Sequence, residues 1–404
     1  MPSTSRIYIA LPVLDESKNI SPLLNCLRLQ SFSNFEIVVC VNQYDDWWNN
    51  SDKLLICKDN LKSIELLNPA DDLNIHFIDR STKGKGWPAK RGGVGWARKT
   101  LMDYITNISD RNDIIVSIDA DTYYPPDYLQ SIFDYFVENE TSGGLAIPYY
   151  HKLASDETDR LILRYEIYMR YYLLNMIRVK NPYGFTALGS AMAFPVWAYK
   201  KVGGLTPVSA GEDFYFLQKL VKATNIGNFC SSIAYPSPRF SNRVDFGTGP
   251  AIIKGKSGDW ESYPNYHYCF FDEVEKTYNL FHNLYEKNIE TPMDEFLETQ
   301  TKKKNIWNPL RKNYKDRKNF MGACVNKVDG LRILQFLRKQ QTTVEISDEE
   351  IIHDYLNLYY KDEIDGNLLL ELKEFRYASS SIELLNELRD FLFQKEMELR
   401  KAGI

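Results

Sequence analysis

The chain has 404 residues, of which 44% are hydrophobic and 25% are charged, and its net charge is −5. A chain of this length and composition can bury a large core, in one enlarged domain or in two domains. Its slightly acidic balance excludes a general electrostatic attraction to nucleic acid. The six cysteines are scattered without C-x-x-C spacing, so we expect reduced thiols rather than disulfides or a zinc site.

Membrane insertion and secretion are also disfavoured. No apolar run approaches the ~20 residues that a membrane-spanning helix needs. The first residues lack the basic and apolar segments of a secretion signal. Together with the cysteine pattern, these features predict a cytoplasmic protein, with peripheral contact to the inner face of a membrane as the alternative.

Short apolar runs alternate with helical patterns along residues 6–139. The runs typical of strands are 6–14, 35–42, 74–80 and 113–121. The runs typical of helices are 21–31, 93–105 and 127–139. This alternation predicts an α/β fold with a Rossmann-like, mostly parallel sheet flanked by helices. Ligands of such sheets bind beyond the carboxyl ends of the strands. Polar residues collect at those ends, namely Asp15, Glu16, Asn42, Gln43, Asp79, Arg80, Asp119 and Asp121.

Further along the chain the pattern changes. We expect a strand at 143–150, a tyrosine-rich helix at 156–180, a strand or loop leading into a short helix at 184–205, and a helix at 209–224. The Pro/Gly-rich stretch 235–258 predicts a flexible loop. Helical periodicity at 271–287, 328–340 and 379–401 predicts a helical C-terminal extension over 266–404.

Asp119 and Asp121 stand one residue apart where the fourth strand ends. Two carboxylates so placed can form a hard, oxygen-rich site for Mg²⁺ or Mn²⁺, which keeps open positions for substrate phosphates. A pair of like charges also favours a cation between them. The alternative is a solvated loop, because a D-x-D sequence is frequent by chance.

Two other charged stretches suggest chemistry. The segment 81–93 supplies Lys83, Lys85, Lys90 and Arg91 just before a predicted helix, whose free N–H groups add positive potential for a diphosphate; a solvated basic loop is the alternative. Glu212 and Asp213 open another predicted helix, where they serve either as dipole-favoured capping residues or as reacting carboxylates. A base role there requires burial or neighbours that raise proton affinity.

Several ordered segments resemble the successive motifs of family-2 nucleotide-sugar glycosyltransferases of the GT-A fold. They are "LPVLDES", "GWPAKRGGVGWA", "SIDADTYYPPDYL" and "GSAMAFPVWAYKKVGGL" with "GEDFYFLQKL". The resemblance spans about 7–224, and ordered motifs are far more specific than one D-x-D. It implies a GT-A type sheet, a nucleoside-diphosphate sugar donor, Mn²⁺ or Mg²⁺, and a hydroxyl acceptor on a glycan, a lipid-linked molecule or another compound.

The resemblance also implies residue roles. The donor would be held by Pro12, Asp15, Glu16, Asn42, Asp79, Lys90, Arg91, Asp119 and Asp121. Asp121 would hold the metal, and Asp119 would reach the ribose or the sugar beside it. Asp213 would be the general base, next to Glu212, which implies inversion at the anomeric carbon.

Two departures from the family pattern concern the donor. Asn42 stands where many members have a carboxylate that contacts the nucleotide base. UDP is the expected nucleotide, but this change leaves the identity of the base open. In the place of the family's A-R-N-x-G, "KRGG" keeps a cation and loses the asparagine. The resemblance places a glycosyltransferase domain at 1–265, with a nucleotide-sugar half at about 1–125 and an acceptor half at about 126–265, followed by the extension 266–404.

Weaker candidates lie outside these motifs. Arg239 and Arg243 either close over the diphosphate or belong to a mobile surface loop. His151 and His267 are alternative third metal ligands or ordinary hydrogen-bonded histidines. The basic segment 302–318 around its tryptophan is either a solvated linker or a contact with an anionic membrane or lipid-linked acceptor.

Two other functions remain open. "SIDADT" also resembles the D-x-D-x-T start of haloacid-dehalogenase phosphatases, with Asp119 as nucleophile and Asp121 as acid/base. That motif normally follows the first strand of its domain, whereas three predicted strands precede it here. The second alternative is a non-catalytic nucleotide-sugar-binding protein, which the substitution at Asn42 favours mildly.

Overall fold

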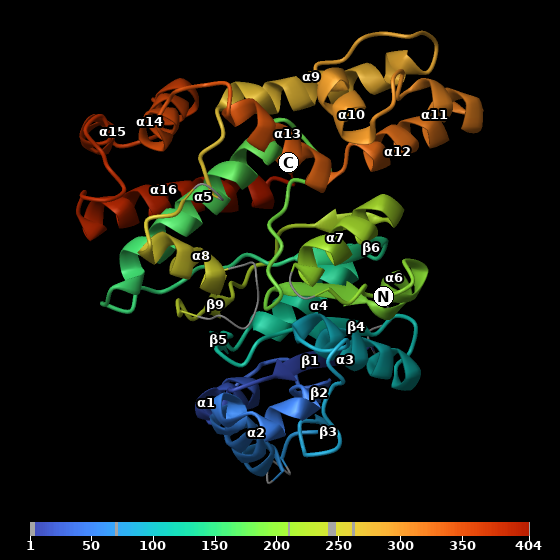
Figure 1. The fold of residues 1–404 in the computed structure, drawn as a ribbon, viewed down its shortest axis with the longest axis vertical. Coiled ribbons are helices and arrows are strands. Elements are labelled where there is room, and N and C mark those ends of the chain that lie inside the picture. The colour runs from blue at the N-terminus through green and yellow to red at the C-terminus, as the bar shows by residue number, and fades with distance from the viewer. Residues whose placement is uncertain (1–4, 69–71, 209–210, 241–247, 261–262, 404) are drawn as a thin grey trace. The chain divides into compact units, whose positions relative to one another are not determined.

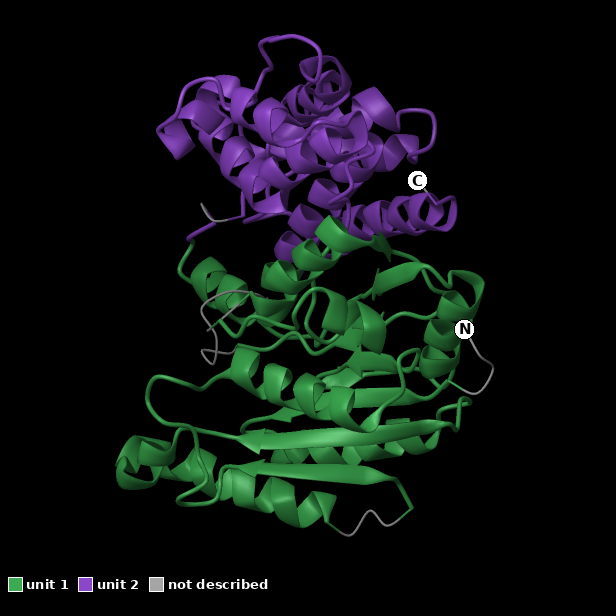
Figure 2. Ribbon diagram, turned by 90° about the vertical axis from the view of Figure 1, so that its right-hand side faces the viewer, with its two compact units in different colours: residues 1–162, 186–258 green, residues 163–185, 259–404 purple. Residues whose placement is uncertain are grey.

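The computed structural model describes residues 5–68, 72–208, 211–240, 248–260 and 263–403. The chain forms two compact units, one of residues 1–162 and 186–258 and one of residues 163–185 and 259–404 (Figure 2). The segment 163–185 thus groups with the C-terminal helices, although it lies inside the predicted domain 1–265. The functional boundary at 265 stays a prediction.

A seven-stranded sheet forms the centre of the first unit, in the order β3-β2-β1-β4-β7-β6-β8 (Figure 1). Its strands are β1 (Ile7–Val13), β2 (Phe35–Asn42), β3 (Ile75–Arg80), β4 (Ile114–Ser117), β6 (Ser142–Ala146), β7 (Met192–Pro195) and β8 (Asn225–Gly227). β1 pairs in parallel with β2 and β4, whereas β7 is antiparallel to both β4 and β6. The predicted mostly parallel sheet is confirmed.

Helices cover both faces of the parallel half of this sheet. They are α1 (Ser17–Arg28), α2 (Leu54–Leu67), α3 (Val94–Ile108) and α4 (Tyr128–Glu138). Ile7, Ile9 and Leu11 of β1 share one buried core with apolar side chains of α1 and α4. Because side chains alternate along a strand, Tyr8 and Ala10 face the opposite side, where α3 packs on β1 and β2. Helices on both faces make this a doubly wound α/β arrangement.

Smaller elements complete the first unit. They are η1 (Asp45–Asn49), η2 (Ser51–Lys53), α6 (Val196–Lys201), α7 (Glu212–Ala223), α8 (Thr248–Lys256) and an antiparallel pair of β5 (Thr122–Tyr123) with β9 (Tyr235–Pro236). The helix predicted at 209–224 is α7; residues 209–210 lie outside the described residues.

The flexible loop predicted at 235–258 is wrong in part, and its residues 241–247 lie outside the described ones. β9 and α8 occupy most of the remainder. Ala251 and Ile252 are both fully buried, so apolar burial stabilises a short helix that the Gly and Pro content had disguised.

The second unit is helical. It contains the part of α5 (Thr158–Arg178) from residue 163 onward, followed by α9 (Tyr268–Leu284), α10 (Asp294–Thr301), α11 (Asn308–Asn313), α12 (Arg317–Lys327), α13 (Gly330–Gln341), α14 (Asp348–Tyr359), α15 (Gly366–Glu371) and α16 (Ile382–Lys401). The predicted helical extension is confirmed. Over the described parts of both units, no helix combines the length and apolar character needed to cross a bilayer.

The basic segment 302–318 is folded within this unit. Trp307 is only 1% exposed, packs against Phe281 with ring centroids 5.5 Å apart, and donates its Nε1–H to Asp294 Oδ1 at 2.7 Å. The segment is therefore folded rather than a free linker, because burial of this indole fixes it to the helical core. Its lysines remain exposed to solvent, as the interpretation as a solvated segment expects.

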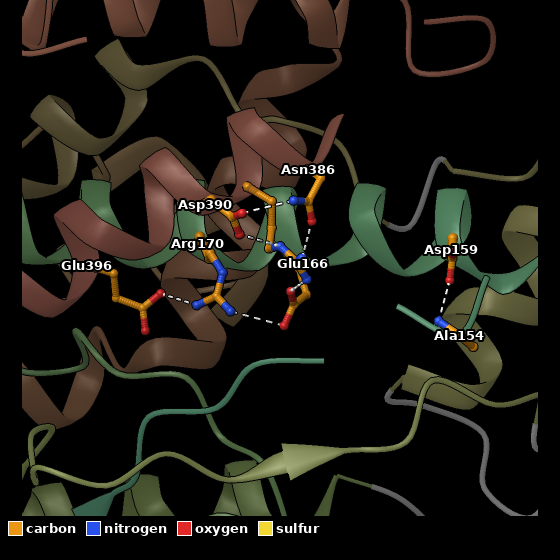
Figure 3. A network of polar contacts seen from close by, with 8 residues as sticks. Ala154, Asp159, Glu166, Arg170, Asn386, Asp390 and Glu396 are labelled. Carbon is orange, nitrogen blue, oxygen red and sulfur yellow. Dashed lines mark hydrogen bonds and ion pairs between the residues drawn. The ribbon is translucent and has the colours of Figure 1, made fainter. Parts of the chain in front are cut away.

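Helices α5 and α16 are joined by buried ion pairs (Figure 3). Arg170 contacts Glu166 at 3.0 Å and Glu396 at 2.7 Å, and Arg389 contacts the other oxygen of Glu166 at 2.8 Å. Arg400 contacts Glu396 at 2.8 Å. All five side chains are at most 2% exposed, so each charge depends on its partners rather than on water.

Candidate active site

The predicted carboxylates meet because β1 and β4 are parallel neighbours. Asp15 and Glu16 follow β1, and Asp119 and Asp121 follow β4, so both pairs leave the sheet at the same edge. Asp15 takes a left-handed conformation with φ of 57°, and its N–H donates to Asn60 Oδ1 at 2.9 Å. This turn leaves Asp15 exposed and directs the chain into α1, with Glu16 buried at its start.

Arg98 of α3 is the buried centre of the site. Its side chain is 3% exposed and contacts Asp119 at 2.7 Å through Nη2 and Glu212 at 2.9 Å through Nε. Its Nη1 donates to Ser117 Oγ and, at 2.7 Å, to the carbonyl of Gly189. Burial opposes the charged form, but Asp119 and Glu212 raise the pKa of the Arg98 guanidinium above its ordinary value. One cation therefore holds the D-x-D motif and the Glu-Asp pair together.

Gly189 makes this arrangement possible. A Cβ at this position would lie 2.4 Å from Nη2 of Arg98, far inside van der Waals contact. Any larger residue would displace the guanidinium, so the glycine of "ALGSAM" is required by the close approach of Arg98. Sequence reasoning did not select Arg98. The available signal was a charged residue on the face of α3 that also carries buried Leu101 and Met102.

Glu212 and Asp213 form the first residues of α7, after Gly211 in the left-handed region at φ of 74°. Glu212 is 4% exposed. Burial and then the neighbouring Asp213 raise its pKa to about 7, although Arg98 acts in the opposite direction. Burial likewise raises the pKa of Asp213, whose Oδ1 accepts the N–H of Phe214 at 2.7 Å. Burial thus outweighs the helix N-terminus and supplies the raised proton affinity that a base role requires.

Arg239 bridges the two strand ends. Its Nε lies 2.7 Å from Asp121 Oδ2, and its Nη2 contacts Glu16 Oε1. The three side chains are largely enclosed, with 22% of Arg239, 17% of Asp121 and 6% of Glu16 exposed. Arg239 therefore joins the predicted metal carboxylate to the predicted nucleotide pocket, while Arg243 lies outside the described residues.

Asn42 and Asp79 stabilise the loops of this edge. Asn42 donates from Nδ2 to the Val13 carbonyl at 2.9 Å and accepts from Trp87 Nε1 at 3.3 Å, so its amide is occupied by the protein. Asp79 Oδ1 accepts the N–H of Ser81 and of Thr82, both at 3.0 Å. Burial would raise the pKa of the Asp79 carboxyl, but these N–H donors outweigh it and hold the pKa below its usual range.

The remaining predicted donor residues lie apart from the Arg98 contacts. Pro12 stands in β1 opposite Cys40 of β2. Lys90 and Arg91 are exposed, and Arg91 stacks over Trp96 with its guanidinium carbon 5.6 Å from the ring centroid. Their charges face solvent in front of α3, so the structure does not link them to the two carboxylate pairs.

The residues present fit a hard divalent cation. Asp119 and Asp121 provide carboxylate oxygens, and Mg²⁺-type sites commonly use one or two carboxylates together with substrate phosphates. In the described part of the chain, no three His, Cys, Asp or Glu side chains gather to hold a metal by themselves. His151 is buried beside Tyr149, and His267 caps α9 in the other unit, so neither joins these aspartates in such a cluster.

The profile of the family described as "Glycosyl transferase family 2" matches residues 8–202, just under half of the chain. Residues 8–202 belong to glycosyl transferase family 2. This family 2 domain contains β1 except its first residue, together with β4, Arg98 and both aspartates of the D-x-D motif. The predicted glycosyltransferase is confirmed. The phosphatase alternative is wrong, since Asp119 follows β4 of a glycosyltransferase sheet rather than a first strand.

Several solved structures resemble the chain weakly. TarS 1–349 of S. aureus in complex with UDP-GlcNAc is 14% identical, with a TM-score of 0.40, over 97% of this chain and 92% of that one. The mannosyltransferase PcManGT from Pyrobaculum calidifontis with GDP-Man and Mn²⁺ is 11% identical, with a TM-score of 0.39, over 97% and 86%. No curated protein matches by sequence. The assignment of the family 2 domain rests on its family match.

Proposed function

We propose that this glycosyltransferase moves a hexosyl group from a nucleoside-diphosphate sugar, with UDP as the expected nucleotide, to a hydroxyl group. The acceptor is a glycan, a lipid-linked molecule or another hydroxyl compound, and the reaction inverts the anomeric carbon. The observation that carries this proposal is the contact of Arg98 with Asp119 at 2.7 Å and Glu212 at 2.9 Å. It joins a donor carboxylate to a carboxylate pair 93 positions later in the sequence.

Donor binding would use the carboxyl edge of the sheet. Pro12, Asp15, Glu16, Asn42 and Asp79 would contact the nucleotide, and the exposed Lys90 and Arg91 would add positive charge for the diphosphate. Asp121 and Asp119 would hold Mn²⁺ or Mg²⁺, which supplies positive charge to the departing diphosphate when bound.

Acceptor activation would use Asp213. An ionised carboxylate with a raised pKa is a stronger base, and Asp213 stands at the start of α7 with its pKa raised by burial. Glu212 contacts Arg98 and adds a like charge beside Asp213, which keeps the pair's proton affinity high. Asp213 would thus take the acceptor proton as the hydroxyl attacks the anomeric carbon.

The decisive experiment separates donor binding from transfer. UDP- and GDP-sugars are first screened with Mn²⁺ for thermal stabilisation, since a ligand of the folded state raises the melting temperature. Asp213→Asn should then keep the affinity for the selected donor and lose transfer by roughly 10²–10⁴-fold, the usual contribution of a general base. Asp134→Asn, on the exposed face of α4, is the matched control.

Three outcomes would overturn this proposal. Near wild-type transfer by Asp213→Asn would remove that residue from the base role. Metal-dependent stabilisation without transfer to any acceptor would favour the non-catalytic alternative. Undiminished Mn²⁺-dependent UDP binding by Asp121→Asn would refute the metal site.

We also propose peripheral contact with an anionic membrane through 302–318. Six lysines of this segment are exposed: Lys302, Lys303, Lys304, Lys312, Lys315 and Lys318. Burial of Trp307 removes the aromatic side chain from any insertion into lipid. The contact would therefore be electrostatic and sensitive to salt.

A further inference from the structure

We infer that Arg239 occupies, in the ligand-free protein, the place of the divalent cation at Asp121, and that metal and donor binding displaces it. This inference rests on the proposed function, because it concerns the same donor site. The supporting observation is the three-residue bridge in which the Arg239 guanidinium contacts Glu16 and Asp121 together.

The bridge joins three separate parts of the first unit. Glu16 stands between β1 and α1, Asp121 follows β4, and Arg239 follows β9. β9 is paired with β5, with Thr122 opposite Pro236 and Tyr123 opposite Tyr235. Since β5 begins directly after Asp121, this pairing holds the chain leading to Arg239 beside the D-x-D motif.

Charge explains why a cation is needed there. Glu16 and Asp121 are both largely enclosed, and two such carboxylates facing one position repel each other without a cation between them. The guanidinium satisfies both in the absence of ligand. A divalent metal would satisfy Asp121 more strongly, because it carries twice the charge on a smaller ion.

Competition between the two cations has a functional consequence. A metal ion alone must displace Arg239 from Asp121, so free metal should bind weakly. A metal that arrives with a nucleoside diphosphate brings new anionic oxygens, and these can accept the displaced guanidinium. Arg239 would thus favour entry of metal and donor together over entry of the metal alone.

The test measures Mn²⁺ binding without any nucleotide, from the electron paramagnetic resonance signal of free Mn²⁺. Arg239→Gln should bind Mn²⁺ at least tenfold more tightly than the wild type. Arg239→Lys, which keeps the charge, should bind less tightly than Arg239→Gln. Arg28→Gln is the matched control and should match the wild type, because Arg28 forms an exposed pair with Asp72.

A double variant ties the effect to Asp121. Adding Asp121→Asn to Arg239→Gln should abolish the gained Mn²⁺ affinity. If Arg239→Gln is unstable, the double variant Glu16→Gln/Arg239→Gln takes its place, because it also removes the repulsion between Glu16 and Asp121. Its Mn²⁺ affinity is then compared with that of Glu16→Gln alone. The same gain of at least tenfold is expected.

The failures of the two proposals differ. If Arg239→Gln binds Mn²⁺ as tightly as the wild type or more weakly, the role of Arg239 is overturned. If all variants still bind Mn²⁺ in the presence of UDP, the proposed function stands in spite of this result. If no protein binds Mn²⁺ with or without UDP, this inference is refuted together with the metal dependence of the proposed function.

Discussion

Arg98 carries two anionic partners inside the protein, so its replacement should be costly. Breaking a buried ion pair from one side typically costs ~3–5 kcal/mol, because a buried charge is left without a partner. Arg98→Gln should therefore lower the free energy of unfolding by about this amount. Arg98→Lys should lower the free energy of unfolding less, because it keeps the positive charge. Some loss should remain, because lysine cannot replace the guanidinium hydrogen bonds to Ser117 and Gly189.

Denaturant unfolding of both Arg98 variants measures this effect. Arg91→Gln, which removes an exposed guanidinium of the same unit, is the control and should stay within about 0.5 kcal/mol of the wild type. If Arg98→Gln lowers the free energy of unfolding by as little as the Arg91→Gln control does, Arg98 does not neutralise Glu212 and Asp119.

The pKa of Glu212, raised to about 7 from its ordinary 4.5, predicts a pH dependence of transfer. The base must be ionised, so kcat/KM should rise with pH and level off above a midpoint near 7 that belongs to the Glu212 and Asp213 pair. Glu212→Gln removes the neighbouring charge and should move this midpoint to lower pH. An unchanged pH profile in this variant would contradict the coupling.

The free energy of unfolding should fall with rising pH, in contrast to the transfer rate. The folded-state pKa of Glu212 lies above the unfolded value of 4.5, so the folded protein binds more protons between pH 4.5 and about 7. The stabilising contribution is therefore complete below pH 4.5 and is lost as the pH rises through about 7. The wild type should lose stability relative to Glu212→Gln over this window, as measured by denaturant unfolding.

At the scale of elements, the ion pairs between α5 and α16 fix the last helix of the chain. Glu166 is fully buried and contacts both Arg170 and Arg389, so Glu166→Gln removes one carboxylate partner from each of two buried guanidinium groups. The change should lower the free energy of unfolding of the second unit by ~3–5 kcal/mol. Limited proteolysis should also release α16 earlier.

An exposed pair of the same unit provides the control. Arg317 contacts Glu286, with 40% and 64% of the two side chains exposed. Arg317→Gln should change the free energy of unfolding by no more than ~1 kcal/mol. If Glu166→Gln has an equally small effect, burial has not made the α5 and α16 pairs interdependent.

At the scale of the whole molecule, charge is distributed unevenly. The chain has a net charge of −5, yet 302–318 carries eight basic residues and one acidic residue. Each lysine near an anionic membrane contributes about 1 kcal/mol, so replacing Lys302, Lys303 and Lys304 by glutamine should reduce vesicle binding roughly 100-fold. Sedimentation with phosphatidylglycerol vesicles measures this loss.

The control replaces three exposed lysines of the first unit, Lys18, Lys58 and Lys62, by glutamine. It should bind these vesicles as the wild type does, and binding of the wild type should weaken with added salt. Equal loss in both triple variants, or no binding of the wild type, would contradict a membrane surface at 302–318.

The mostly parallel sheet, the helical C-terminal part and the polar edge where the site lies are all predictable from the amino-acid sequence. Side-chain periodicity and strand order are local or nearly local properties, and Asp119 and Asp121 follow β4 wherever that strand packs. The smaller elements were harder to predict. α8 is stabilised by burial of two apolar residues, and the pair β5 and β9 depends on segments more than 100 residues apart.

The pairing of charged side chains depends on the three-dimensional packing. Arg98 meets Glu212, and Arg239 meets Glu16 and Asp121, across separations that no local pattern encodes. The proton affinity of Glu212 likewise depends on tertiary contacts. A helix N-terminus lowers the pKa of a carboxyl, and its burial with a second carboxyl raises it, so the outcome depends on the surrounding packing rather than on position in the chain.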